Sequence, residues 1–452
     1  MQVDFSPANL QKLSLIPICF VSFTLNTEIV DDYLRIFLYF CCPNHSAHKP
    51  DERGWKNNTI LVTMDLENRH SKLPVVRVGF IGLGERGCQA VRRWCHIPNT
   101  QIVAACDLNS QKISDALTIM NGNGRDPCAV EQSAEDLCRR EDVDLVYICT
   151  DWESHTELAC LALSFGKHVA VEVPAAMTIK DCWRLVDMAE RQQRHCMMLE
   201  NACYDYFEMV TAAMARAGLF GTIVNATGGY HHWLNERWEP WRLRYNHDHR
   251  GDVYPTHGLG PVCLALGIHR TDYIETLVSM DSAAVAGPDY YKKVCGDNDN
   301  GFRNGDVTTT LLRTRLGKTI VLDHDVVTPR PYSRLYQLVG TTGFAAKYPQ
   351  ETLWLNGREL TGKEVEQTLD EWLPEDIRRL RETAAKYDNR GGISYIMDSR
   401  LVSNLRAGRP MDMDVYDLAE WCAVVELSRV SLEKGSVPVA FPDFRRHRVQ
   451  AL

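Results

Sequence analysis

The sequence contains no uninterrupted apolar run of the roughly 20 residues that a membrane-spanning helix needs. Two apolar stretches near the N-terminus, residues 13–25 and 33–42, are interrupted by Pro17 and Arg35. No positively charged segment precedes the first stretch, and no twin arginine occurs there, so an export signal is not expected. We therefore predict a cytoplasmic protein with no membrane partner.

The cysteines and histidines of the sequence do not show the spacings that are typical of metal ligands. The 16 cysteines include no Cys-x-x-Cys pair and no regular ladder of spacings. Cys106 and Cys149 fall inside apolar runs, where cysteine packs as a small hydrophobe. We interpret most cysteines as buried reduced thiols, which indicates a reducing compartment. Four histidines of the second half also lack a paired-ligand motif, so no metal site is expected there: His231, His232, His247 and His249.

The sequence has fewer basic than acidic residues: 50 Lys and Arg against 59 Asp and Glu, which gives a net charge of −9. This balance argues against nucleic acid as the main partner. It leaves room for an anionic ligand held at a helix N-terminus or by local arginines. The 452 residues, 45% hydrophobic and 24% charged, are typical of a soluble globular protein with two domains and appendages.

Residues 1–63 do not resemble the rest of the chain, and Met64 stands just before the polar stretch that leads into the first predicted strand. We interpret them as an atypical N-terminal extension and hypothesise that it is dispensable. From residue 75 to 196, apolar strands alternate with helical segments, which predicts parallel pairing and right-handed crossovers. The first domain is therefore predicted to be α/β, a doubly wound parallel sheet of the Rossmann kind, with its strands at residues 75–81, 102–106, 143–149 and 168–171.

The pattern changes in residues 197–444. Strands with one solvated face are predicted at residues 222–230, 307–313, 318–326 and 335–340. Helices are predicted at residues 208–217 and 415–431, and a charged amphipathic stretch covers residues 363–387. This half is expected to be an α+β substrate domain with a mixed or antiparallel sheet.

A glycine-rich turn follows the first predicted strand and precedes a helix, with an acid 20 residues past its last glycine. Gly82 permits the tight turn, Gly84 lets the backbone approach a pyrophosphate, and Gly87 lets helix and strand pack closely. The helix N-terminus offers free N–H groups to the phosphates. We predict a dinucleotide site formed by Gly82, Leu83, Gly84, Glu85, Arg86 and Gly87.

Asp107 ends the second predicted strand. A carboxylate at this position accepts hydrogen bonds from ribose hydroxyls and repels a 2′-phosphate, so NAD is favoured over NADP. The alternative is a surface aspartate beside a structural turn. Just past the third strand, Thr150 and Trp152 are expected to line the nicotinamide ribose, and His155 to reach it. The alternative there is an N-cap threonine, with Trp152 and His155 as packing residues.

Later motifs carry a family resemblance. Glu172-Val173-Pro174 follows the fourth strand, where the Gfo/Idh/MocA oxidoreductase family usually has Glu-Lys-Pro. With the runs at residues 171–176, 199–204, 254–261 and 414–417, the chain from about residue 75 to 444 resembles glycoside hydrolase family 109, the NAD-dependent α-N-acetylgalactosaminidases. Two stretches depart from the expected pattern: Arg390-Gly391-Gly392-Ile393-Ser394, and His231-His232-Trp233 after Tyr230.

The resemblance implies a redox-neutral glycosidase. NAD⁺ takes hydride from sugar C3, the resulting ketone acidifies the C2 hydrogen, and the C1 substituent leaves by elimination. Water then adds, and C3 is reduced again. The cofactor supplies the difficult chemistry, while the protein supplies position and proton transfer.

The catalytic candidates are His257 first and Tyr254 second, because histidine titrates near neutral pH and the two lie three residues apart on a Pro/Gly-rich segment. Tyr204 is a candidate acid or base at C2. Glu172 is a candidate to orient the sugar or nicotinamide, or to act as a base. The alternative for each is a buried structural side chain.

Two other functions remain open. One is a net NAD-dependent sugar or cyclitol dehydrogenase, against which Val173 counts because valine cannot move a proton. The other is a non-catalytic NAD-binding protein. The expected partners are NAD and a small-molecule glycoside, with a homodimer as a further expectation.

Overall fold

Two β-sheets organise the part of the chain that the computed structural model describes, which is residues 72–234, 238–296, 301–388 and 391–446. All of these residues belong to one compact unit, residues 59–452. The predicted N-terminal extension, residues 1–63, lies outside the described residues. Within those that are described, no helix combines the length and the apolar character needed to cross a bilayer.

The first sheet has six parallel strands in the order β3-β2-β1-β4-β5-β6. This is the Rossmann order, and it confirms the predicted fold class. Its strands are β1 (Val76–Ile81), β2 (Thr100–Cys106), β3 (Ala129–Val130), β4 (Leu145–Ile148), β5 (His168–Val171) and β6 (Cys196–Met198). The predicted pattern missed β3 and β6, because two or three residues are too few to show a period.

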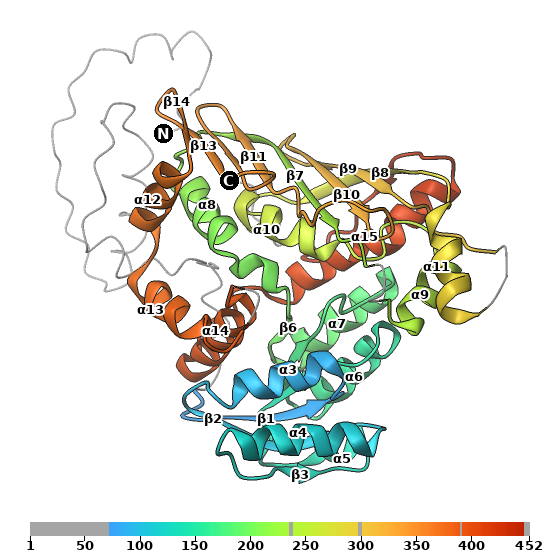
Figure 1. The fold of residues 1–452 in the computed structure, drawn as a ribbon, viewed down its shortest axis with the longest axis vertical. Coiled ribbons are helices and arrows are strands. Elements are labelled where there is room, and N and C mark those ends of the chain that lie inside the picture. The colour runs from blue at the N-terminus through green and yellow to red at the C-terminus, as the bar shows by residue number, and fades with distance from the viewer. Residues whose placement is uncertain (1–71, 235–237, 297–300, 389–390, 447–452) are drawn as a thin grey trace, which may run out of the picture. The chain divides into compact units, whose positions relative to one another are not determined.

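Helices cover both faces of this sheet (Figure 1). They are α3 (Glu85–Trp94), α4 (Ser110–Gly122), α5 (Ala134–Arg139), α6 (Trp152–Ser164) and α7 (Ile179–Gln192). Four of them begin at a side-chain cap that accepts a backbone N–H: Asn109, Ser133, Asp151 and Thr178. Helix α3 has no such cap, because Gly84 stands at its N-terminus.

The second sheet is mixed, as predicted. Its order is β14-β13-β12-β11-β7-β10-β9-β8-β15, and β7 and β10 pair in parallel while the other neighbours are antiparallel. The strands are β7 (Ile223–His231), β8 (Ile274–Asp281), β9 (Thr308–Thr314), β10 (Thr319–Asp325), β11 (Gln337–Gly340), β12 (Phe344–Ala346), β13 (Thr352–Leu355), β14 (Arg358–Thr361) and β15 (Val439–Ala440).

Helices α8, α10 and α15 lie between the second sheet and the Rossmann domain (Figure 1). The helical elements of this half are η2 (Asn201–Tyr204), α8 (Tyr206–Arg216), α9 (Pro240–Asp248), α10 (Thr256–Leu266), α11 (Ala286–Cys295), α12 (Lys363–Trp372), α13 (Glu375–Ala384), α14 (Ile393–Ala407) and α15 (Val415–Glu433). The charged stretch predicted at residues 363–387 is two helices, because Pro374 interrupts it and becomes the N-cap of α13.

Helix α10 contradicts local propensity, since it contains Gly258, Gly260 and Pro261. Glycine allows it to pack backbone to backbone on β7. A Cβ atom at Gly258 would lie 2.3 Å from the nitrogen of Gly229, and one at Gly228 would lie 2.2 Å from the carbonyl oxygen of Gly258. This close approach seats the N-terminus of α10 at the end of β7.

Candidate active site

The glycine-rich turn has the geometry that a dinucleotide requires. Gly82 adopts a positive φ of 86°, and a Cβ atom at Gly87 would lie only 2.1 Å from the carbonyl oxygen of Gly82. A Cβ atom at Gly84 would meet nothing within 4 Å. The turn therefore packs tightly on its protein side and stays open on the side from which a diphosphate would approach.

The residues around this turn fit NAD. The first-turn N–H groups of α3 have no side-chain cap, so they can bind phosphate oxygens. Asp107 accepts hydrogen bonds from the backbone nitrogens of Leu83 (2.6 Å) and Asn109 (2.8 Å), which fixes its carboxylate beside the turn. Its remaining lone pairs can accept ribose hydroxyls. The Glu85 side chain is exposed and accepts from Gln89.

The end of β4 carries the next predicted residues. Asp151, rather than Thr150, caps helix α6, and Thr150 accepts a hydrogen bond from the hydroxyl of Ser154. Nδ1 of His155 lies 2.7 Å from the carbonyl oxygen of Pro174, and its Nε2 lies 3.1 Å from that of Thr150. Burial lowers the pKa of His155. Its ring thus ties the loops after β4 and β5 together.

Glu172, at the end of β5, lies 3.6 Å from the guanidinium of Arg86 in the glycine-rich turn. Burial opposes ionisation of Glu172, but Arg86 and Arg93 outweigh it, and the pKa of this carboxyl is lowered. Glu172 is therefore an anion at neutral pH. Val173, where the lysine is usual, is buried.

The N-terminus of α10 places the two first-choice catalytic residues side by side. The rings of Tyr254 and His257 have centroids 5.0 Å apart, and both side chains are buried. Oε1 of Glu200, which is fully buried, lies 2.7 Å from Nδ1 of His257, although the two are not aligned as a hydrogen bond. Such contacts often tighten only when substrate binds. A carboxylate behind Nδ1 leaves Nε2 of His257 as the nitrogen that can exchange protons.

Aromatic rings and one arginine extend this group. Tyr230, at the end of β7, packs against both Tyr254 (4.9 Å) and His257 (5.1 Å between ring centroids). The Arg242 guanidinium lies over the rings of Trp152, at 5.2 Å, and Tyr254, at 5.9 Å. Burial raises the pKa of Tyr254, and Arg86 and Arg242 partly oppose that rise. Residues of the Rossmann strand ends and of α10 therefore meet in one electrostatically connected group.

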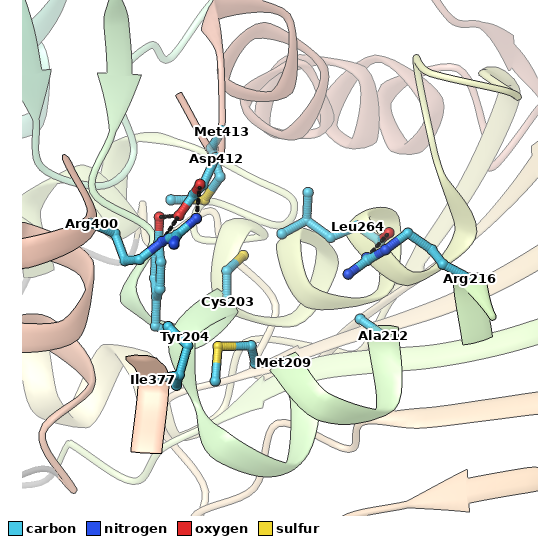
Figure 2. A pocket seen from close by; sticks show the side chains of 10 residues that line it. All are labelled: Cys203, Tyr204, Met209, Ala212, Arg216, Leu264, Ile377, Arg400, Asp412 and Met413. Carbon is cyan, nitrogen blue, oxygen red and sulfur yellow. Dashed lines mark hydrogen bonds and ion pairs between the residues drawn. The ribbon is translucent and has the colours of Figure 1, made fainter. Parts of the chain in front are cut away.

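Tyr204 ends the short helix η2, whose N-cap is Glu200, and its hydroxyl contacts a different set of side chains. Its hydroxyl donates a 3.1 Å hydrogen bond to Asp412, which also receives two hydrogen bonds from Arg400. These residues line a cavity of about 20 Å³, with room for about one water molecule, between η2, α8 and α10 (Figure 2). Burial, and then Asp412, raise the pKa of Tyr204 well above its usual value.

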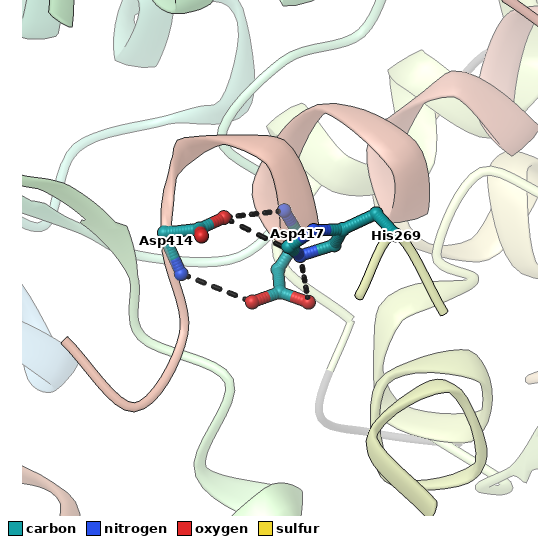
Figure 3. A group of neighbouring side chains, drawn as sticks. All are labelled: His269, Asp414 and Asp417. Atoms are coloured by element: carbon teal, nitrogen blue, oxygen red, sulfur yellow. Dashed lines mark hydrogen bonds and ion pairs between the residues drawn. The ribbon is translucent and has the colours of Figure 1, made fainter. Parts of the chain in front are cut away.

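A second titratable cluster lies at the N-terminus of α15. His269, Asp414 and Asp417 bring three potential ligand atoms together (Figure 3). Asp417 completes a capping box with Asp414, and both of its oxygens accept hydrogen bonds from Arg270. The cation needed by these carboxylates is thus already supplied by arginine, and the cluster anchors α15 to the loop after α10.

Sequence reasoning missed three members of the site: Glu200, Tyr230 and Arg242. Asp107 was predicted because it ends a strand that is visible in the sequence. Glu200 follows strand β6, whose three residues are too few to be recognised as a strand. Tyr230 lies in a predicted strand, but only the glycine contact with α10 brings it to His257. No sequence signal marked Arg242.

Two family models match the chain. One described as Glycosyl hydrolase 109, C-terminal domain, matches residues 235–451, and one described as Oxidoreductase family, NAD-binding Rossmann fold, matches residues 76–200. The Glycosyl hydrolase family 109 protein 1 of Bacteroides thetaiotaomicron is 48% identical over 400 residues, which cover 83% of this chain and 86% of its own. The family 109 protein of Porphyromonas gingivalis is 50% identical with the same coverage.

Solved structures share the fold at low identity. Levoglucosan dehydrogenase in complex with NADH and L-sorbose superposes with a TM-score of 0.64 at 16% identity, covering 82% of this chain and 100% of that one. The myo-inositol dehydrogenase of Lactobacillus casei, in complex with NAD(H) and myo-inositol, gives 0.58 at 17% identity with the same coverage. At these identities the likeness establishes the shared architecture alone.

Proposed function

Because this chain belongs to glycoside hydrolase family 109 and its residues 76–200 form an NAD-binding Rossmann domain, we propose that it cleaves α-N-acetylgalactosaminides by a redox-neutral route. When bound, NAD supplies a hydride acceptor for sugar C3 and gives the hydride back at the end of the cycle. The side chains of this chain then have to orient the sugar and handle its protons.

The observation that carries the proposal is the state of the two carboxylates in the site. An ordinary glycosidase needs one carboxylic acid and one carboxylate facing each other across the scissile bond. Here Glu172 is paired with Arg86, and Glu200 stands behind His257. Both are buried, at 8% and 0% exposure. Neither is placed as the free partner of the other, so a mechanism without paired carboxylates fits better.

Each residue then has a role that follows from its contacts. His257, backed by Glu200, accepts the proton of the C3 hydroxyl at Nε2 and returns it later. Tyr254 binds the same hydroxyl and fixes its direction. Glu172, held ionised by Arg86, accepts hydrogen bonds from sugar hydroxyls and orients the ring. Val173 has no proton to exchange, which argues against an ordinary dehydrogenase cycle.

The test is incubation of the purified protein with NAD⁺ and para-nitrophenyl α-N-acetylgalactosaminide, with nitrophenol and NADH absorbance read together. Nitrophenol release without net NADH supports the proposal. NADH accumulation on free sugars, with no nitrophenol release, would move the chain to the dehydrogenases. The matching β-glycoside tests the preference for the α-anomer, and the α-galactoside without the acetamido group tests the preference for the N-acetyl sugar.

A further inference from the structure

Tyr230 and His232 form a hydrogen-bonded pair beside the candidate catalytic residues. The hydroxyl oxygen of Tyr230 lies 2.6 Å from Nδ1 of His232, and their rings meet edge to face. The ring of Tyr230 also touches those of Tyr254 and His257. Both members of the pair are partly exposed, whereas Tyr254 and His257 are buried. The pair therefore lies at the accessible side of the group.

The partner of Tyr230 distinguishes it from the other phenols nearby. The hydroxyl of Tyr204 donates to the Asp412 carboxylate, and burial, followed by this carboxylate, raises the pKa of the phenol. The hydroxyl of Tyr332 accepts from the Arg334 guanidinium, so its partner has no lone pair to take a proton. The Tyr230 hydroxyl instead faces an imidazole nitrogen, which can receive the phenolic proton when the ring is neutral and protonated at Nε2.

We propose that Tyr230 and His232 act as a proton-transfer pair that removes the C2 proton of the sugar after C3 has been oxidised. This inference rests on the proposed glycosidase function and assigns its elimination step. It gives a role to His232, which belongs to the stretch after Tyr230 where the sequence departs from the pattern expected of the family. The hydroxyl of Tyr204, in contrast, is bonded to Asp412.

The step balances in atoms and electrons. The phenolic proton of Tyr230 moves to Nδ1 of His232 as the phenolic oxygen takes the proton from C2. The C2–H electron pair becomes the C1=C2 double bond, and the C1–O bond breaks with its pair leaving on the aglycon oxygen. The protons on Tyr230 and His232 exchange with solvent while the intermediate is bound. Water then adds its oxygen to C1, Tyr230 donates a solvent-derived proton to C2 and takes one back from His232, and the proton that water loses neutralises the aglycon oxygen.

Neighbouring titratable groups define the setting of the pair. Tyr254 and His257 face Tyr230 from the α10 side, and the ring of Tyr332 lies 5.2 Å from that of His232. The backbone nitrogen of His232 donates to the carbonyl oxygen of Asp325, which fixes the segment on β10. A protonated imidazole has no lone pair at Nδ1, so the pair can act only while His232 is neutral.

The test follows exchange of the C2 hydrogen with deuterium oxide and nitrophenol release in Tyr230→Phe. We expect both rates to fall about 10²–10⁴-fold, the usual contribution of a positioned acid or base. Affinity for NAD and thermal stability should stay near the wild type. Tyr336→Phe is the matched control, because it removes a buried hydroxyl that contacts Thr211 in the same domain. It should keep both rates within about twofold.

His232→Asn gives a second, independent variant and should lower the same two rates. In NAD-free protein, the His232 ring resonance, assigned from its loss in His232→Asn, should titrate at a shifted pH in Tyr230→Phe but not in Tyr336→Phe. An unshifted titration, or wild-type C2 exchange in Tyr230→Phe, would overturn the inference alone. A wild-type protein that neither exchanges C2 nor releases nitrophenol from any glycoside would overturn the proposed function as well.

Discussion

Replacing Glu200 by glutamine tests whether the carboxylate behind His257 serves the reaction. The amide keeps the shape of the side chain, and its oxygen can still accept the hydrogen bond that Oε1 receives from Ala202 at 3.1 Å. The negative charge 2.7 Å from Nδ1 of His257 is lost. The same exchange behind the catalytic histidine of serine proteases lowers kcat about 10⁴-fold.

We expect kcat of Glu200→Gln to fall by about 10²–10⁴-fold, or about 2.7–5.4 kcal/mol in barrier height, because His257 loses the charge that stabilises its protonated form. KM should change far less, and the free energy of unfolding should not fall by more than about 1 kcal/mol. Steady-state nitrophenol release across pH, with thermal unfolding, measures all three.

Glu420→Gln is the matched control. Glu420 is also buried and also accepts one backbone hydrogen bond, from Ile274 at 3.1 Å, but it belongs to the cluster around His269. Its kcat should stay within about twofold of the wild type. Wild-type kcat and an unchanged pH profile in Glu200→Gln would refute the reasoning, and an equal loss in Glu420→Gln would show that the effect is structural.

Four further substitutions probe the cofactor site and a buried acid. Gly87→Ala should abolish NAD binding and destabilise the fold, because its Cβ atom would lie 2.1 Å from a backbone oxygen. Gly84→Ala should keep the fold and weaken NAD binding about tenfold or more. Calorimetry measures NAD binding, and thermal unfolding measures stability. Asp107→Asn should reduce the preference for NAD over NADP about tenfold or more, measured as the ratio of the two dissociation constants, since it no longer repels a 2′-phosphate. Burial raises the pKa of Asp252 to about 8. The folded protein therefore holds a proton that the unfolded chain releases above about pH 4. As the pH rises from about 4 to about 8, the free energy of unfolding should fall by up to about 1.4 kcal/mol per pH unit. Denaturant unfolding of Asp252→Asn, which keeps an oxygen for the Tyr254 amide, should show a shallower fall over this range, and an equally steep one would contradict the assignment.

The Rossmann half could be predicted because its signals are local. The turn at Gly82 stands directly between a strand and a helix, and Asp107 ends the next strand, so chain order alone brings them together. The 2.6 Å contact between Asp107 and Leu83 follows from adjacent strands in a sheet whose order is fixed by the fold.

The catalytic half could be predicted only in part, because its contacts join distant segments. The hydroxyl of Tyr204 is directed by Asp412, 208 positions away, which no spacing rule anticipates. Helix α10 exists against its own propensity because Gly258 fits onto β7, so its packing is decided by tertiary contact. The same fit brings Tyr230 to His257, which explains why Tyr230 gave no signal in the sequence.

The most direct test of the redox-neutral cycle is the fate of hydrogen at sugar C3. A para-nitrophenyl α-N-acetylgalactosaminide deuterated at both C2 and C3 is hydrolysed in ordinary water, and the product sugar is analysed by NMR and mass spectrometry. We expect deuterium to stay at C3, because the hydride that leaves this carbon returns to it, and to be replaced by solvent hydrogen at C2. Hydrolysis that leaves C2 unexchanged with no isotope effect from C3 deuteration, or deuterium accumulating in free reduced cofactor, would contradict it.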